Sequence, residues 1–184
     1  MKIYLGIDPG KDGAIARMDC EGQRVELVKF YDTPTLKAGA QGKRDYDEAA
    51  MAELLIDLVA SSREDGCEVF VAIEKQFAMP RLGVPPCGKC KRVPGPGITS
   101  TFETGKGYGV WLGIVAASMA PFVVVHPATW KALLMRDAPK GKDASRMVAS
   151  RTFPDVAGSL KRVKDHNRAE ALLICEYGRR VSAR

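Results

Sequence analysis

The sequence predicts an α/β fold built on a central mixed five-stranded sheet, in which three antiparallel strands are followed by two parallel strands and helices flank the sheet. Three short, apolar, β-rich runs separated by turn residues open the chain, a pattern typical of antiparallel strands. A segment of helical periodicity then leads into another apolar run, and strand–helix–strand order implies a parallel crossover. A last apolar run at residues 121–126 supplies the fifth strand.

Length favours one domain, because 184 residues suffice for one core but hardly for two. We therefore expect residues 1–184 to form a single domain.

No stretch of the sequence approaches the roughly 18 uninterrupted apolar residues that a membrane span needs, and no signal-peptide pattern opens the chain. We expect a cytoplasmic location without membrane contact. Five mostly scattered cysteines favour reduced thiols over a disulfide framework.

The charge balance favours a polyanionic partner such as nucleic acid, since the chain has 28 Lys and Arg and 22 Asp and Glu, a formal charge of +6.

Residues 2–8 and 13–19 are predicted to form a hairpin that carries Asp8 at the end of its first strand, and residues 24–31 are predicted to form a third strand. Residues 36–44 are predicted as a flexible basic loop, either a nucleic-acid contact or solvated surface.

An amphipathic helix is predicted next, with Asp45 or Asp47 as its cap. Its apolar positions repeat at helical spacing: Met51, Leu54, Leu55, Leu58 and Val59. The following run, residues 67–73, is predicted as a buried strand that ends at Glu74. A parallel crossover would place this strand beside the first, so Asp8 and Glu74 would end neighbouring strands at the carboxyl edge, where open α/β sheets bind ligands.

Residues 79–101 are rich in proline and glycine and carry Cys87 and Cys90, and we expect an insertion here. A helix follows, with Trp111 and Val115 on its apolar face. The glycine-dense residues 104–109 precede that helix and either approach a phosphate or allow close helix packing.

The last part of the chain is predicted to hold a strand at residues 121–126, a cationic helix at 142–151 and a final helix at 165–177 that ends at Gly178. His166 and Glu170 are four residues apart and therefore share one face of this helix. Asp165 suits the position that caps it.

Carboxylates that converge at a sheet edge repel one another unless a cation neutralises them. Oxygen-rich sites of this kind suit Mg²⁺ or Mn²⁺. Two such ions can hydrolyse a phosphodiester, one generating hydroxide and the other stabilising the leaving oxygen. The acids and the basic surface together therefore predict a metal-dependent phosphodiesterase with about two ions per site and no small-molecule cofactor.

Four motifs carry a resemblance to a known family: Leu5–Gly10, Ala72–Phe77, His126–Lys131 and His166–Ile174. They resemble the motifs of RuvC-type Holliday junction resolvases, within the RNase H-like superfamily, and are most similar to its phage and plant-organellar branches. The resemblance implies an RNase H-like fold and a homodimer that binds a four-way DNA junction. It also implies a structure-selective endonuclease that nicks two strands symmetrically with Mg²⁺ or Mn²⁺, leaving 5′-phosphate and 3′-hydroxyl ends.

By position, the resemblance implies that Asp8, Glu74 and Glu170 bind metal and are catalytic. RuvC itself commonly has two aspartates three apart on the last helix, whereas Asn167 stands at the corresponding position here. We assign the fourth ligand to His166, with Asp165 or Asn167 as the alternatives.

The same resemblance implies DNA-binding residues. Phe77 matches an aromatic residue near the junction centre, where it would stack on an unpaired base, although a core phenylalanine fits the sequence equally well. Lys131 and Lys142 resemble basic DNA contacts near the scissile phosphate. The Cys87/Cys90 pair looks like an addition to typical RuvC. It is half of a tetrahedral zinc site, which two chains of a dimer could complete, or a simple reduced pair.

Other function classes remain open on the sequence alone. An RNase H-like phosphodiesterase acting on flap DNA or RNA/DNA hybrids would carry the same acids. An ATP-binding domain of the actin and sugar-kinase type has a similar opening hairpin but normally needs a much longer, duplicated chain. A non-catalytic DNA-binding module would share the basic surface and lack metal-dependent nicking.

Overall fold

A computed structural model describes residues 1–38, 42–77, 97–139, 141 and 143–182. Its main sheet has the strand order β3-β2-β1-β6-β7. Strands β1 (Lys2–Asp8), β2 (Ala14–Glu21) and β3 (Arg24–Asp32) are antiparallel neighbours. Strand β6 (Glu68–Glu74) runs parallel to β1, and β7 (Phe122–Val125) runs parallel to β6. The predicted mixed five-stranded sheet, with three antiparallel strands followed by two parallel strands, is confirmed.

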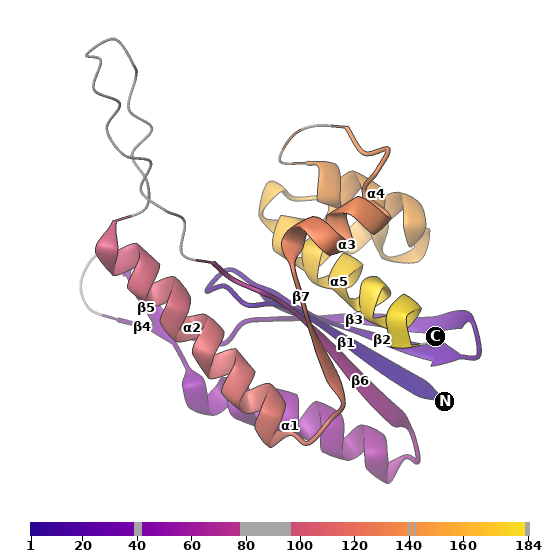
Figure 1. The fold of residues 1–184 in the computed structure, drawn as a ribbon, viewed down its shortest axis with the longest axis horizontal. Coiled ribbons are helices and arrows are strands. Elements are labelled where there is room, and N and C mark those ends of the chain that lie inside the picture. Colours follow the sequence, from indigo (N-terminus) through magenta and orange to yellow (C-terminus); the bar gives the residue numbers. More distant parts are fainter. Residues whose placement is uncertain (39–41, 78–96, 140, 142, 183–184) are drawn as a thin grey trace.

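Helices cover both faces of this sheet (Figure 1). Helices α1 (Glu48–Glu64) and α2 (Ile98–Ala117) pack on one face. The other face carries α5 (His166–Ser182), with α3 (Pro127–Leu134) and α4 (Ala144–Thr152) beside it. Two 3₁₀ segments, η2 (Pro154–Leu160) and η3 (Val163–Asp165), connect α4 to α5.

The two faces of β1 bury different cores, because successive side chains of a strand point to opposite faces. Ile3, Leu5 and Ile7 lie in the core beneath α1 and α2, whereas Tyr4 lies in the core beneath α5. The same alternation carries Asp8 to the α5 face of the sheet.

Strand β6 repeats this arrangement. Val71 and Ile73 belong to the core beneath α1 and α2, and Ala72 belongs to the core beneath α5. Glu74 therefore ends β6 on the α5 face. Both strand-end acids point to the side of the sheet where the final helix lies.

The segment predicted as a basic loop is partly a second sheet. Strands β4 (Thr35–Lys37) and β5 (Arg44–Tyr46) pair as an antiparallel hairpin. The two strands have three residues each, too few for a recognisable alternation. Tyr46 is buried in the core, and its ring packs where a side chain on Gly107 would overlap it. The contact between Tyr46 and Gly107 joins residues far apart in the sequence, so the local sequence pattern does not reveal it.

Three helix boundaries differ from those predicted. Helix α2 includes the glycine-dense residues 104–109, so their role is close packing, at Gly107, and the phosphate-loop alternative is wrong. Helix α4 begins at Ala144, after its N-cap Asp143. Gly178 lies within α5, where a Cβ would stand 2.8 Å from that of Ala72, so close packing against β6 explains this glycine. Within the described part of the chain, every helix is too short or too polar to cross a membrane.

Candidate active site

Asp8 ends β1 and is followed by a tight turn. The Gly10 amide donates to the Asp8 carbonyl at 3.0 Å, and the Gly13 amide donates to the Gly10 carbonyl at 2.9 Å. A Cβ on Gly13 would overlap the Asp8 carbonyl oxygen, so this turn requires glycine there. The turn leaves the Asp8 side chain only 8% exposed at the edge of the sheet.

Glu74 lies beside Asp8 because β1 and β6 are in parallel register, with Ile7 opposite Ile73. Its carboxylate is buried and held on both oxygens. The Trp130 indole Nε1 donates to Oε1 at 2.8 Å, and the Gln76 side-chain amide donates to Oε2 at 3.1 Å. The predicted meeting of two acids at the carboxyl edge of the sheet is present in the structure.

Glu170 approaches these acids from α5. Its Oε1 accepts a hydrogen bond from the Ser145 hydroxyl at 2.8 Å and lies 3.3 Å from the Lys131 ammonium. Ser145 belongs to α4 and Lys131 to α3, so the two smaller helices hold the third acid in place. Segments far apart in the sequence thus converge at one end of the sheet.

The charges of the three acids affect one another's ionisation. Burial raises the pKa of Asp8 well above its usual range, and the Glu170 and Glu74 carboxylates raise it further. Burial also raises the pKa of Glu74, against the lowering effect of the Trp130 hydrogen bond. The Lys131 ammonium lowers the pKa of both acids. Buried acids that repel one another and have shifted pKa values are typical of functional sites.

The donor set fits a hard divalent cation in kind, since carboxylate oxygens are the ligands that Mg²⁺ and Mn²⁺ prefer. Within the described ranges, however, no three His, Cys, Asp or Glu side chains are arranged to hold a metal ion directly. Instead, Lys131 and hydrogen-bond donors engage Glu170 and Glu74. Metal binding would require the side chains of Asp8, Glu74 and Glu170 to rearrange.

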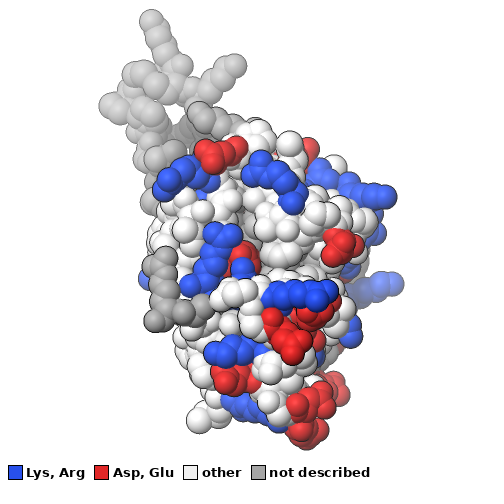
Figure 2. All heavy atoms as spheres, turned by 90° about the vertical axis from the view of Figure 1, so that its right-hand side faces the viewer, with Lys and Arg blue, Asp and Glu red and all other residues white. Residues whose placement is uncertain are grey.

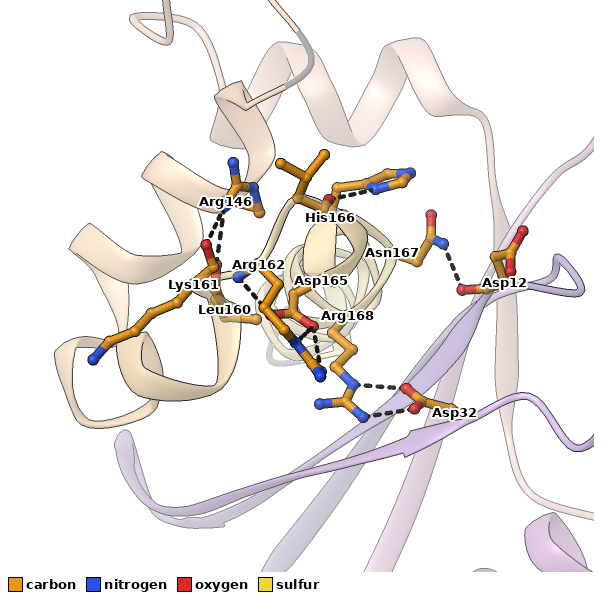
Figure 3. Close-up of polar contacts among 11 residues, drawn as sticks. Asp12, Asp32, Arg146, Leu160, Lys161, Arg162, Asp165, His166, Asn167 and Arg168 are labelled. Carbon is orange, nitrogen blue, oxygen red and sulfur yellow. Dashed lines mark hydrogen bonds and ion pairs between the residues drawn. The ribbon is translucent and has the colours of Figure 1, made fainter.

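The structure does not bring His166 to these acids. Its Nδ1 lies 3.0 Å from the Val163 carbonyl, and its ring lines a neighbouring cleft (Figure 3). Asp165 is buried, accepts from the Arg162 backbone amide at 2.7 Å and pairs with its guanidinium. Asn167 donates to the Asp12 carbonyl and lines the hollow that also contains Asp8. The assignment of His166 as fourth ligand stays a prediction, and Asn167 is the alternative nearer Asp8.

The neighbouring cleft has a volume of about 460 Å³ and a cationic lining. Its charged residues are Lys11, Arg44, Arg162, Lys164 and Arg168, against Asp12, Asp32 and Asp165. Most of these cations are paired; Arg168, for example, binds Asp32 through two hydrogen bonds of 2.6 Å (Figure 3). Elsewhere on the surface, Figure 2 shows lysines and arginines interspersed with acidic side chains on one face of the molecule.

The predicted DNA-binding residues fall into two groups. Phe77 is 42% exposed, so the core alternative is wrong; its ring centroid lies 4.6 Å from that of His126, and Lys75 lies above it. Lys131 is at the acids, as described above. Lys142 and the Cys87/Cys90 pair lie outside the described residues.

Sequence reasoning missed the residues that orient the acids. Trp130 and Gln76 lie within two of the motifs named above, but the sequence assigns no role to them or to Ser145. Trp130 directly precedes Lys131 in α3, so a signal for it existed in the motif His126–Lys131. Ser145 carries no such signal, because only the packing of α4 against α5 brings it to Glu170.

Comparisons with known proteins give one curated relative. No protein-family model matches the chain. Over 85 residues the chain is 33% identical to the chloroplastic Holliday junction resolvase MOC1 of Chlamydomonas reinhardtii, a match that covers 46% of this chain and 10% of that protein. The chain therefore spans about a tenth of the length of this relative. The predicted resemblance to Holliday junction resolvases is confirmed.

Two solved structures are also similar to the chain. One is T. thermophilus RuvC in complex with Holliday junction substrate, with a TM-score of 0.48, 17% identity, and coverage of 94% of this chain and 90% of that chain. The other is a Thermus thermophilus RuvC structure, with a TM-score of 0.48, 16% identity, and coverage of 98% and 96%.

Proposed function

We propose that this chain is a structure-selective DNA endonuclease that resolves four-way junctions by metal-dependent hydrolysis of phosphodiester bonds. The convergence of Asp8, Glu74 and Glu170 at the carboxyl edge of the sheet is the observation that carries this proposal. The similarity to a protein named as a Holliday junction resolvase supports the choice of substrate.

Asp8, Glu74 and Glu170 are the residues that would hold Mg²⁺ or Mn²⁺. When bound, the divalent cation supplies an activated water and neutralises charge on the phosphodiester oxygens. The acids must be ionised for this role; Asp8 and Glu74 are buried, whereas the Glu170 side chain is 22% exposed. Two ions per site is our proposal, with Asn167 or His166 as the further ligand.

Lys131 has a role of its own in this proposal. Its ammonium lies beside Glu170 and remains 41% exposed, so it can also reach a phosphate outside the acids. A cation there would attract the scissile phosphate and offset the repulsion between the nucleic acid and the carboxylates. Lys131 would thus position the substrate, while the acids bind the metal.

The cationic cleft offers a path for the rest of the DNA strand. Lys11, Asp12, Gly13 and Asn167 line both this cleft and the hollow that contains Asp8, so the two adjoin. Successive phosphates of one strand could therefore pass from the acids into the cleft. On the other side, exposed Phe77 would stack on an unpaired base near the junction centre, and Lys142 would add a phosphate contact.

A homodimer belongs to the same proposal. A four-way junction is symmetric, and two identical sites related by a twofold axis would nick two of its strands symmetrically. Cys87 and Cys90 from both chains would then complete a four-thiolate zinc site if their segments meet at the dimer axis. Metal analysis together with the mass of the particle in solution tests both points: zinc-free dimers would contradict the zinc site, and monomers would contradict the dimer.

The test of the function is cleavage of synthetic substrates at one salt concentration, because salt governs protein–DNA affinity. A four-way junction, a flap and an RNA/DNA hybrid are compared with Mg²⁺ and with a chelator, and Asp8→Asn is the control. We expect Mg²⁺-dependent paired nicks in the junction with 5′-phosphate ends. Preferential cleavage of flaps or hybrids would replace the substrate assignment, and absence of cleavage of all three would contradict the nuclease proposal.

A further inference from the structure

Trp130 is a core tryptophan that hydrogen-bonds an acid of the candidate active site. Its side chain is fully buried, yet its indole Nε1 donates to Glu74 Oε1 at 2.8 Å. By contrast, the buried Nε1 of Trp111 has no hydrogen-bond partner among the described residues. The two buried tryptophans therefore differ in one respect: one of them is directed at an acid of the candidate active site.

Two hydrogen bonds fix the N-terminal end of the short helix that carries Trp130. Helix α3 begins at Pro127, after the N-cap His126, whose Nδ1 accepts from the Ala128 amide at 3.1 Å. The Lys75 amide donates to the Val125 carbonyl at 2.8 Å, which ties the end of β7 to the residue after Glu74. Helix α3 thus starts from a strand end that pairs with the end of β6, so the backbone brings Trp130 close to Glu74.

Each carboxylate oxygen of Glu74 accepts a hydrogen bond from a different side chain. Oε1 accepts from the Trp130 indole N–H, and Oε2 accepts from the Gln76 side-chain amide at 3.1 Å. A carboxylate held on both oxygens cannot rotate freely about its terminal bond. Hydrogen bonds of this kind to metal-binding carboxylates orient the ligand, and their loss costs about 10–100-fold in metal affinity or activity.

We propose that Trp130 is a positioning residue for Glu74: its indole N–H holds the carboxylate in the orientation that binds the divalent cation. This inference rests on the proposed function, since it takes Glu74 as a metal ligand. Trp130 touches neither substrate nor metal in this role. The same indole also lies beside Lys131, whose ammonium is 4.9 Å from the centroid of the Trp130 ring and pairs with Glu170.

The first test compares the Mn²⁺ affinity of the wild type, Trp130→Phe and Trp111→Phe, measured by calorimetry without DNA. Phenylalanine keeps an aromatic ring in the core and removes the N–H. We expect Trp130→Phe to bind Mn²⁺ about tenfold more weakly and Trp111→Phe to bind as the wild type does. We also expect junction cleavage by Trp130→Phe to recover as Mg²⁺ is raised, which general damage to the fold would not produce. A folded Trp130→Phe protein with wild-type Mn²⁺ affinity would overturn the inference.

If Trp130→Phe does not fold, replacement of both tryptophans by benzothienylalanine provides the second test. This analogue has sulfur in place of the indole N–H and nearly the same shape. Because the Trp111 N–H has no partner within the described structure, the replacement removes one relevant hydrogen bond, that to Glu74. About tenfold weaker Mn²⁺ binding supports the inference, and unchanged binding overturns it.

A spectroscopic readout separates this inference from the proposed function. In a Trp111→Phe background Trp130 is the remaining tryptophan, and we expect Mn²⁺ to quench its emission and Glu74→Gln to abolish that response. Failure of the wild type to bind Mn²⁺ at all would contradict the proposed function itself. Tight Mn²⁺ binding that leaves the Trp130 emission unchanged would contradict only the role of Trp130.

Discussion

Gly6 of β1 lies directly beneath Ala171 of α5, so closely that a Cβ on Gly6 would overlap the Ala171 carbonyl oxygen. The pair stands at the centre of the site, because Asp8 is two residues beyond Gly6 and Glu170 directly precedes Ala171. The absence of a side chain at Gly6 lets the helix approach the strand. That approach brings the third acid to the first.

Gly6→Ala is therefore expected to destabilise the protein strongly. The new methyl group would have to push α5 away from β1, and overpacking of this kind typically costs about 1–3 kcal/mol. Gly109→Ala is the matched control: it lies in α2 with open space around it, and replacing a helical glycine should stabilise the fold by up to about 1 kcal/mol. Denaturant unfolding measures both changes. A Gly6→Ala protein as stable as the wild type would contradict the close packing.

Removing a metal-binding carboxylate should abolish cleavage and spare DNA binding. We expect Asp8→Asn, Glu74→Gln and Glu170→Gln each to cut a four-way junction at least about 100-fold more slowly. Losing a hydrogen bond to a metal ligand costs about 10–100-fold in activity, and losing the ligand itself should cost more. Gel-shift affinity for the junction should change little, since phosphate contacts govern it. A variant that cuts at the wild-type rate would remove its residue from the site.

The raised pKa of Asp8 predicts how pH changes stability. A carboxyl whose pKa is higher in the folded than in the unfolded protein binds its proton more tightly when folded, so ionisation weakens the fold as pH rises from the unfolded toward the folded pKa. At neutral pH with a chelator, Asp8→Asn should therefore melt at a higher temperature than the wild type. Asp137→Asn, an exposed acid outside the site, is the control.

The same pKa predicts that protons compete with metal. As pH falls toward the raised pKa of Asp8, a growing fraction of the protein carries a proton where the cation should bind. The Mg²⁺ concentration for half-maximal cleavage should rise as pH is lowered. A half-maximal concentration that does not vary between mildly acidic and mildly basic pH would contradict the role of Asp8 as a ligand.

Lys131 and Phe77 should affect the substrate more than the fold. Lys131→Ala is expected to slow cleavage about tenfold or more, because it loses one charge-assisted contact worth about 1.5–3 kcal/mol. Lys2→Ala, at the far end of β1, should have no effect.

Phe77→Ala should lower the fluorescence change of 2-aminopurine at the junction centre without lowering the melting temperature. Phe122, 43% exposed at the start of β7, is the matched control.

Much of the fold followed from local patterns. The order of the strands could be predicted because strand–helix–strand connections constrain which strands are neighbours, and Asp8 and Glu74 end two of these strands. The short strands β4 and β5 could not be predicted, since their pairing depends on Tyr46 packing against Gly107 in a distant helix. Trp130 and Ser145 likewise acquire their roles from contacts with Glu74 and Glu170 that connect separate elements.

Anomalous diffraction from crystals soaked in Mn²⁺ shows directly whether Asp8, Glu74 and Glu170 share divalent cations. We expect a strong anomalous peak within coordination distance of oxygens from all three side chains, lost in crystals of Glu74→Gln. A peak held by other residues, or no peak at these carboxylates in crystals that retain activity when dissolved, would contradict this expectation.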